Sequence, residues 1–370
     1  MTTEFLRTKP HVNIALIGQN IVDRHALRQN MVDVAGKRLC KTSKSETRRL
    51  GNPALAELET QHRHYAINES PGEGPGMIAT LCGTDIAVLL VSTLDDIEYN
   101  RQPILTLRQL GVRHLMILMG QCESDINVKQ ADNLERVIRK QLTDYEYPGD
   151  TLPIIRSNQQ VLETDILHLL AYCDEIPPPE RDLTGSLKMP IQHVTGGTGG
   201  NVAISGCIVR GTVAEGSIVE LLGFQGMRQG YCTAVGTFDK VLTEGQAGDQ
   251  ATVFLSGLSL ADVYPGQVLA PLGNLSCCNR LMADVYLPMP EEGGNGLGLI
   301  TGDRLTFCIG NSEVEGTLEL PPEWQTAVPG STIELTIALA APTVMDRGEG
   351  IFGYDGSALM LAGNVARLLN

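Results

Sequence analysis

The first apolar run of the chain is followed by glycine and charged residues at the spacing of a phosphate-binding loop. Val12 to Ile17 is typical of a buried strand, and the next residues, Gly18-Gln19-Asn20-Ile21-Val22-Asp23-Arg24-His25, fill the pattern G-x-x-x-x-G-K-[ST]. In that pattern the second glycine lets backbone amides close on phosphates, the lysine reaches their oxygens, and the hydroxyl binds Mg²⁺. Asp23, Arg24 and His25 stand at those three places, so the spacing is kept while the chemistry is changed.

Each of the three replacements predicts weaker nucleotide binding. The carboxylate of Asp23 repels a polyphosphate. Arg24 keeps a positive charge in a different geometry, and His25 is a poor Mg²⁺ ligand because that ion prefers oxygen. Two interpretations remain open for these residues: solvated loop charges without a ligand, or a pocket remodelled for a different ligand. No other histidine or cysteine lies at a convincing metal-binding spacing from His25, so no metal site is predicted.

Length and composition predict a protein of two or three domains without a membrane span. The chain has 370 residues and a net charge of −15, which argues against a broad basic surface and hence against DNA as a partner. It contains no apolar stretch of bilayer length, and its N-terminus lacks the apolar core of a signal peptide. Its cysteines show no paired C-x-x-C spacing, which indicates free thiols in a reducing compartment. We therefore expect a cytoplasmic protein with no membrane partner.

Strand and helix patterns alternate over residues 1–176. Such alternation predicts a mostly parallel sheet with helices on both faces. Ligands of such sheets bind at the carboxyl ends of the strands, where the loops after Ile17, Ile67 and Met119 fall. The strand candidates are Val12–Ile17, His64–Ile67, Ile86–Ser92, His114–Met119 and Leu152–Ile155, and the helix candidates are Gln102–Leu110, Val128–Leu142 and Val161–Tyr172.

Consecutive prolines at 177–179 end this region and predict a stiff linker over residues 177–184. Beyond it, short strand patterns separated by glycine turns predict two β-barrels, over residues 185–272 and 273–370. The strand candidates of the first are Met189–Val194, Gly200–Gly211, Ser217–Leu222, Gln229–Phe238, Asp249–Leu255 and Gln267–Ala270. Those of the second are Arg280–Leu287, Asp303–Ile309, Gly316–Leu320, Ser331–Ala340, Gly350–Tyr354 and Leu359–Leu368.

Read in order, these segments resemble the elongation factor Tu branch of the translational GTPases over nearly the whole chain. The resemblance implies a P-loop GTPase-like α/β domain over residues 1–176, followed by two antiparallel β-barrel domains. The matching runs include Arg7-Thr8-Lys9-Pro10-His11-Val12-Asn13-Ile14, Arg63-His64-Tyr65-Ala66, Asp144-Tyr145-Glu146-Tyr147-Pro148-Gly149-Asp150, Glu244-Gly245-Gln246-Ala247-Gly248-Asp249, Pro265-Gly266-Gln267-Val268-Leu269-Ala270 and Gly316-Thr317-Leu318-Glu319-Leu320-Pro321.

The nucleotide motifs implied by this resemblance are all altered. Glu69-Ser70-Pro71-Gly72-Glu73 stands where D-C-P-G-H is expected, so Glu73 replaces the histidine that orients the attacking water. Its negative charge would repel both the γ-phosphate and hydroxide. Gly120-Gln121-Cys122-Glu123 replaces the guanine-reading N-K-x-D, and each lost charged hydrogen bond costs roughly 1.5 to 3 kcal/mol. No catalytic residue is expected. The degenerate nucleotide site comprises Gly18, Asp23, Arg24, His25, Glu69, Gly72, Gln121 and Glu123.

The contacts with tRNA that the resemblance implies are altered as well. Gly236-Thr237-Phe238-Asp239 stands where an E-M-x-R run places a glutamate against the terminal adenosine. The positions that contact the T-stem map to Thr306, Glu315, Ala341 and Gly356, of which Gly356 is kept. Ala341 replaces a lysine and Glu315 a threonine, so attraction for phosphate is lost at one position and becomes repulsion at the other. Delivery of aminoacyl-tRNA is therefore not expected.

Two functions from different classes follow. The first is a non-catalytic binding, regulatory or structural component, linked to translation, that works with a protein partner or within a larger complex and needs no cofactor. A tRNA or a ribosome is a further partner class, with weaker support. The second is a guanine-nucleotide switch with little or no GTPase activity, in which Arg24 takes the part of the lysine and GTP or GDP binds with Mg²⁺. In either case we expect a constitutive arrangement of the domains.

Overall fold

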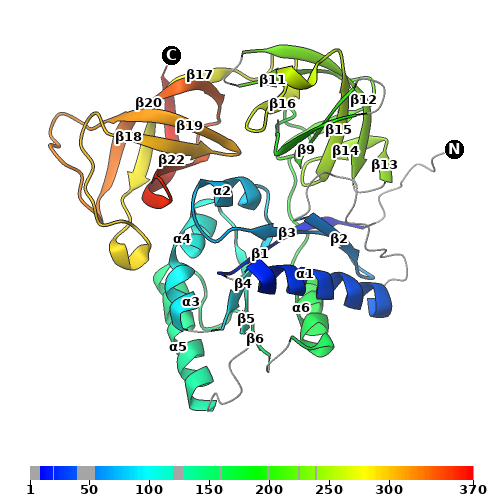
Figure 1. Ribbon diagram of the computed structural model, residues 1–370, viewed down its shortest axis with the longest axis vertical. Helices are drawn as coiled ribbons and strands as arrows, with labels where there is room; N and C mark the ends of the chain where they lie inside the picture. The colour runs from blue at the N-terminus through cyan, green and yellow to red at the C-terminus, as the bar shows by residue number, and fades with distance from the viewer. Residues whose placement is uncertain are drawn as a thin grey trace.

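The computed structural model describes residues 9–19, 21–39, 55–92, 94–119, 128–157, 161–197, 201–223, 226–237 and 240–369. These residues form an α/β unit followed by two antiparallel β units, which lie side by side above it in Figure 1. None of the helices in this part of the chain combines the length and the apolar character needed to cross a bilayer. The cysteines that can be described are free thiols, as the sequence predicts.

The α/β unit is built on a six-stranded sheet of order β2-β3-β1-β4-β5-β6. Five strands are parallel, which confirms the predicted mostly parallel sheet, and β2 pairs antiparallel with β3 at one edge. The edge strand β2 was not predicted. The strands are β1 (His11–Ile17), β2 (Leu55–Glu59), β3 (His64–Ser70), β4 (Ile86–Val91), β5 (His114–Met119) and β6 (Ile154–Arg156).

Helices cover both faces of this sheet because its strands are apolar on both sides. In β1, Ala15 and Ile17 pack with α2, α4 and α5, whereas Ile14 and Leu16 pack with α1 and α6. The helices are α1 (Ile21–Val34), continued by the π-helical turn η1 (Ala35–Leu39), α2 (Pro75–Leu81), α3 (Leu94–Tyr99), α4 (Arg101–Gln109), α5 (Val128–Asp144) and α6 (Glu163–Glu175).

The first β unit is a curled antiparallel sheet of order β7-β16-β11-β12-β15-β9-β8. Its two ends are consecutive in the chain. Between them, the amide of Ile191 donates to the carbonyl of Gln267 (2.8 Å) and the amide of Gln192 to that of Ser205 (2.8 Å), so one stretch of chain joins both edges. The strands are β7 (Met189–Pro190), β8 (His193–Gly196), β9 (Val202–Cys207), β10 (Thr212–Ala214), β11 (Ile218–Leu222), β12 (Arg228–Thr237), β13 (Lys240–Leu242), β14 (Glu244–Gln246), β15 (Gln250–Ser256) and β16 (Val268–Pro271), with the 3-10 turn η3 (Leu260–Asp262).

The second β unit is a closed barrel in the order β17-β20-β19-β18-β21-β22, which confirms the barrel predicted there. Pairing of β17 with β22 closes it. Leu281, Phe307, Ile337 and Leu361 are among the residues that fill its interior. The strands are β17 (Cys277–Tyr286), β18 (Arg304–Ile309), β19 (Ser312–Glu319), β20 (Thr332–Val344), β21 (Gly350–Asp355) and β22 (Ala358–Leu369), and the 3-10 turn η4 (Pro290–Glu292) projects from it.

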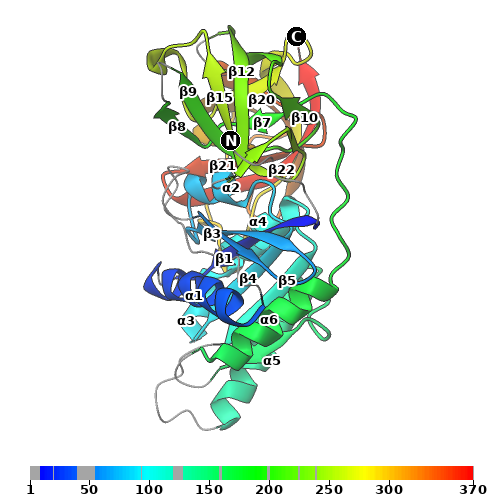
Figure 2. The ribbon, with the colours of Figure 1, turned by 90° about the vertical axis from the view of Figure 1, so that its right-hand side faces the viewer.

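Buried contacts join all three units. Residues 177–184 run without regular structure along one side of the molecule (Figure 2), and Arg181 pairs there with Asp85 of the α/β unit at 2.6 Å. The buried Lys188 joins the two β units through Asp346 (3.1 Å) and Glu349 (2.7 Å). Phe352 of the barrel belongs to the same hydrophobic cluster as α2 and α4. The described units therefore pack as one body.

Candidate functional site

The loops that follow β1 and β3 meet at one edge of the sheet, as the sequence predicts. The strands are neighbours in parallel register, with Leu16 beside Glu69 and Ile17 beside Ser70, so Gly18 and the Pro71 turn emerge together. The third predicted loop, with Gln121 and Glu123, lies outside the described residues. In the part of the site that the structure describes, the side chains come from α1, β3 and α3.

Arg24 is turned back onto its own loop. It lies on α1 with only 6% of its surface exposed, and its guanidinium donates a hydrogen bond to the carbonyl oxygen of Gly18. Its Nε is buried without a hydrogen-bond partner. A buried guanidinium that is committed to a backbone carbonyl has less hydrogen-bonding capacity left for an anion. Asp23, half-buried beside it, adds a negative charge to the same turn.

Glu69 is held by Arg28 and His25 of α1. Its carboxylate Oε1 lies 2.5 Å from Nε of Arg28, and the side chains are 9% and 3% exposed. A second guanidinium nitrogen of Arg28 lies 2.9 Å from Nδ1 of His25. The same Nδ1 of His25 lies 3.2 Å from Oε1 of Glu69, so His25 and Arg28 both face this carboxylate. Glu69, which stands at the aspartate of the expected D-C-P-G-H motif, thus forms an internal ion pair.

Tyr99 fills the space beside Gly72. A Cβ built on Gly72 would overlap the ring of Tyr99, which comes from the end of α3. Burial raises the pKa of Tyr99, and the negative charge of Glu73 raises it further, against the opposing effects of Arg24 and of a backbone hydrogen bond from Gly72. The ring therefore lies among Gly72, Glu73 and Arg24, at the mouth of the predicted site. Glu73 itself is exposed.

Sequence reasoning missed two residues of this site, Arg28 and Tyr99. Arg28 lies four residues beyond Arg24, so both side chains share one face of α1, and this spacing was the available signal. Tyr99 carries no comparable signal, because its role depends on how closely α3 approaches the turn at Gly72. The described cations of the site are bonded to chain groups, so the arrangement favours a closed, self-paired site over an open anion pocket.

The strand register brings together three of the four positions that the resemblance assigns to the T-stem, and the fourth, Ala341, lies on β20 against the barrel core. Thr306 pairs with Glu315 across β18 and β19 and with Tyr354 across β18 and β21, and Gly356 follows in the next turn. Glu315 is exposed and places a carboxylate on this surface. In the first β unit, the hydroxyl of Thr237 is buried and donates to the carbonyl of Gln250 at 2.7 Å. Residues 238 and 239 lie outside the described part of the chain.

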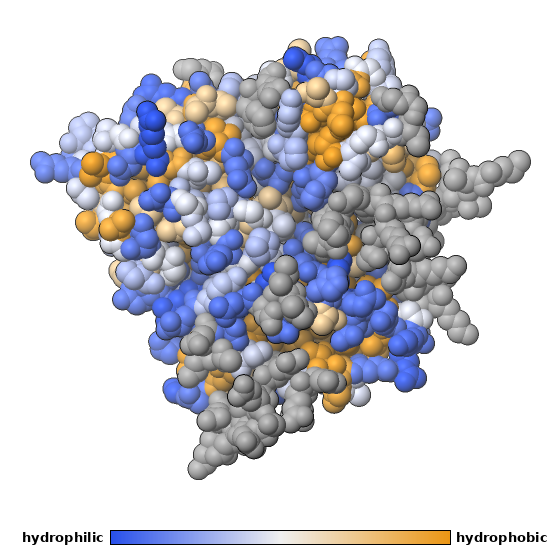
Figure 3. All heavy atoms as spheres, in the orientation of Figure 1, coloured by the Kyte–Doolittle hydropathy of each residue, from blue (hydrophilic) through white to orange (hydrophobic). Residues whose placement is uncertain are grey.

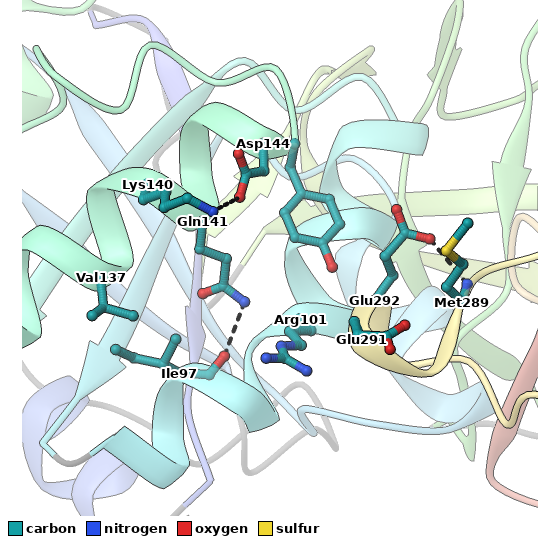
Figure 4. Close-up of a pocket in the computed structure, with 10 residues that line it drawn as sticks. Ile97, Arg101, Val137, Lys140, Gln141, Asp144, Met289, Glu291 and Glu292 are labelled. Atoms are coloured by element: carbon teal, nitrogen blue, oxygen red, sulfur yellow. Dashed lines mark hydrogen bonds and ion pairs between the residues drawn. The ribbon is translucent and has the colours of Figure 1, made fainter. Parts of the chain in front are cut away.

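A separate pocket of about 470 Å³ opens between the α/β unit and the barrel. Figure 4 shows Gln141 and Lys140 of α5 on one side, Glu291 and Glu292 of η4 on the other, and Arg101 between them. Gln141 donates to the carbonyl of Ile97 at 3.0 Å, but its Oε1 and the hydroxyl of Tyr145 are buried without a partner. The pocket therefore offers a buried hydrogen-bond acceptor, the Gln141 amide oxygen, and a buried hydroxyl, that of Tyr145, at a contact between two units.

A cluster of two carboxylates and a histidine lies on β2 and at the start of β3, at the opposite end of β3 from the site described above. Glu57, Glu59 and His64 bring their ligand atoms within 4.8 Å of one another. The ammonium of Lys240, from β13, lies 2.6 Å from Glu57 and 3.1 Å from Glu59, and Lys9 lies 3.3 Å from Glu59. Lysine ammonium groups thus take the place between the carboxylates that a metal ion would need.

No family model matches the chain. The interpretation of the site therefore depends on its geometry and on the sequence motifs themselves.

Proposed function

We propose that the chain is a divergent relative of elongation factor Tu that has lost GTP hydrolysis and aminoacyl-tRNA delivery and acts as a non-catalytic binding or regulatory component. The order of one α/β unit and two antiparallel β units agrees with the architecture that the sequence resemblance implies. Because a fold does not determine a function, the proposal depends on the residues at the sheet edge.

The observation that carries the proposal is that the described part of this edge is occupied by the chain's own side chains. Arg24 bonds the Gly18 carbonyl, Arg28 neutralises Glu69, and Tyr99 covers Gly72. A polyphosphate would need to separate the buried Arg28–Glu69 pair or displace Tyr99 before it could reach the backbone. It would also meet the carboxylates of Asp23 and Glu73, which a nucleotide site of this kind does not tolerate.

Titration with a fluorescent GTP or GDP analogue in the presence of Mg²⁺ tests the loss of nucleotide binding. We expect no saturation up to about 100 µM, which corresponds to a binding free energy weaker than about 5.5 kcal/mol. Saturation below that concentration, together with a nucleotide-dependent rise in Tm, would refute the proposal and establish the nucleotide switch.

The alternative switch has one observation in its favour. Arg24 stands at the place of the lysine, and its Nε is a buried donor without a partner. In a nucleotide complex this guanidinium would have to leave the Gly18 carbonyl. Saturable binding of the GTP analogue by the unchanged chain that an Arg24→Ala variant loses would support this alternative.

A protein partner is the binding class that we propose. Figure 3 shows separate apolar patches on the face over the two β units, amid hydrophilic surface. On the sheet of the first β unit, Ile218 and Tyr231 are cross-strand neighbours with 52% and 57% of their surface exposed. Capture of the full-length protein from its native cells, with an Ile218→Ser/Tyr231→Ser variant as the matched control, would identify chains that depend on this pair.

A further inference from the structure

The pocket between the α/β unit and the barrel is lined by elements that are far apart in the chain. The end of α3, the start of α4 and the second half of α5 form one side, and η4 of the barrel forms the other (Figure 4). Its volume of about 470 Å³ is typical of a site for a small molecule. The described residues that line it include none from the ends of β1 and β3, so a ligand of this pocket and the loss of nucleotide binding can be tested separately.

The most buried polar side chain of the pocket is that of Gln141, with 8% of its surface exposed. Figure 4 shows its amide nitrogen bonded to the carbonyl of Ile97, at 3.0 Å, and this hydrogen bond fixes which end of the amide is the oxygen. That oxygen, Oε1, has no partner in the described part of the chain. A buried acceptor without a donor is unfavourable, so a ligand that brings an N–H group to Oε1 gains from the contact.

The hydroxyl of Tyr145 is the second buried polar group of the pocket without a partner among the described residues. Burial raises the pKa of Tyr145, and the negative charge of Glu292 raises it further, against the opposing effect of Arg101. The side chain is therefore a neutral phenol, which can donate one hydrogen bond and accept another. Its response to Glu292 and Arg101 also shows that charges of both signs lie near it.

Those charges have bonding capacity left. Arg101, at the start of α4, lies 3.7 Å from the exposed Glu98, which is longer than a hydrogen bond, so its guanidinium keeps donors for another group. On the opposite side, Glu291 is exposed and has no hydrogen bond or ion pair with the described chain. Glu292 is half-buried and accepts the amide of Met289 at 2.9 Å through Oε2.

The composition of the pocket selects a class of ligand. Lys140 and Asp144 at its rim neutralise each other at 3.1 Å, which leaves one cation on α4 and two carboxylates on η4. A simple amine would leave the guanidinium unpaired, and a simple anion would meet the carboxylates. A ligand with both charges avoids both penalties. The apolar lining consists of Ile97, Val137 and Met289.

We propose that this pocket binds a small zwitterion with an apolar body, the class that comprises free amino acids and short peptides with apolar side chains. The carboxylate of the ligand accepts hydrogen bonds from Arg101 and from the hydroxyl of Tyr145. Its N–H groups donate to the carboxylates of Glu291 and Glu292 and to Oε1 of Gln141. Its apolar body lies against the apolar lining.

Such a ligand would bridge two units of the molecule. Arg101 and Gln141 belong to the α/β unit, whereas Glu291 and Glu292 belong to the barrel. A ligand that binds the packed state and not the unfolded chain stabilises it by mass action. We therefore expect the Tm of the full chain to rise with the concentration of the zwitterion.

Leucine and leucyl-leucine are the probes, followed through the carbon-13 methyl signal of Met289, which a Met289→Leu variant identifies. We expect a saturable shift with a Kd of about 1 mM or lower for at least one probe, and the tighter of the two shows whether a free amino acid or a peptide fits. Leucyl-leucine amide lacks the carboxylate and N-acetyl-leucyl-leucine lacks the ammonium, so both should bind at least about tenfold more weakly. No saturation by either probe up to about 10 mM, or equal binding of the blocked forms, would overturn the proposal.

Two neighbouring tyrosines separate a ligand contact from a structural one. Tyr145→Phe removes a hydroxyl without a partner in the described chain, so it should weaken binding about fivefold and leave the Tm of the free chain unchanged or higher. Tyr147→Phe is the matched control, because its hydroxyl donates to the carbonyl of Val112 at 2.8 Å and lies outside the pocket. It should lower the Tm and leave the Kd unchanged. The reverse result for the two variants would show that the Tyr145 hydroxyl is not a ligand contact.

The guanidinium is tested in the same titration. Arg101→Met should weaken binding of the zwitterion at least about tenfold, because a charged hydrogen bond is lost. Glu98→Gln is its control, since Glu98 pairs with Arg101 from outside the pocket, and it should bind as the unchanged chain does. An Arg101→Met variant with the affinity of the unchanged chain would contradict the assignment of the carboxylate.

Discussion

At the scale of single residues, the site at the ends of β1 and β3 is an internal ion pair and a packed ring where the sequence motif suggests a phosphate cradle. Arg28 and Glu69 are both nearly buried, so each neutralises a charge that would otherwise be left in a medium of low polarity. This pairing explains how this region can fold although its residues differ from those that bind a nucleotide.

Replacing one partner of this pair should be more harmful than replacing both. We expect Glu69→Gln to lower the free energy of unfolding by about 3 kcal/mol, because it leaves the Arg28 guanidinium buried without its counter-charge. The double variant Arg28→Met/Glu69→Leu should lose clearly less. Urea unfolding at pH 7 measures both, with Lys140→Met, which breaks an exposed pair with Asp144, as a control that changes little. Equal losses for the single and double variants would contradict this account.

A methyl group at Gly72 should expel the Tyr99 ring. Because burial raises the pKa of Tyr99, the Gly72→Ala variant should return that pKa toward the ordinary tyrosine value and destabilise the fold by about 1 kcal/mol. A phenolate difference titration against the unchanged chain detects the change. Gly76→Ala is the control, since a Cβ there meets nothing within 4 Å, and a similar shift in that variant would disprove the assignment.

At the scale of elements, sequence patterns predicted the central strands of the α/β sheet and missed its edge strand β2. β1, β4 and β5 are nearly continuous apolar runs, which is typical of central parallel strands. β2 alternates apolar residues with glutamates, and these glutamates act at an interface that no local pattern reveals. In α1, polar residues interrupt the buried Leu27 and Met31, which obscured the helical period.

The candidate site was predictable only in part for the same reason. The position of Gly18 after β1, with Arg24 and His25 in the element that follows, and their meeting with Glu69 follow from the alternation of strands and helices. The partners that give these residues their role, Arg28 and Tyr99, are set by packing distances between elements. Local sequence contains no information on such distances.

The helix α4 contributes apolar side chains to the contact between the α/β unit and the barrel. Leu107 is fully buried between the sheet and the barrel, and Arg108 is exposed. We expect Leu107→Ala to lower the free energy of unfolding by about 2 to 5 kcal/mol, through lost burial and a residual cavity. Arg108→Ala should change it by less than about 1 kcal/mol, because its pair with Glu146 is exposed. Thermal or urea unfolding that ranks the two variants the other way would disprove this role of α4.

At the scale of the whole molecule, contacts between every pair of units fix their arrangement. Ser312 of the barrel donates to the Gly266 carbonyl at 2.6 Å, and Gln192 of the first β unit donates to the Ala79 carbonyl at 3.0 Å. On the third boundary, Gln102 of α4 lies 3.5 Å from the hydroxyl of Tyr354. These contacts join groups of the chain itself, so a ligand that touches none of them would not change the packing of the units.

Small-angle X-ray scattering should therefore give the same radius of gyration with GTP, with GDP and without nucleotide. The physical reason is that a ligand shifts a conformational equilibrium only by its difference in affinity for the two states. A Lys188→Met variant, which leaves Asp346 and Glu349 without their cation, is the positive control and should increase the radius. A nucleotide-dependent change in the unchanged chain would contradict a constitutive arrangement.

The hydrophobic cluster shared by α2, α4 and the barrel also affects how the protein is made. Cys308, Phe352, Tyr354, Leu359 and Ala362 complete a core whose other members lie in the first half of the chain. During synthesis, the ribosome adds these residues after all the other members of the cluster. The apolar faces of α2 and α4 therefore stay uncovered until the barrel has been made, and a chain that stops before the barrel would present them to chaperones and proteases.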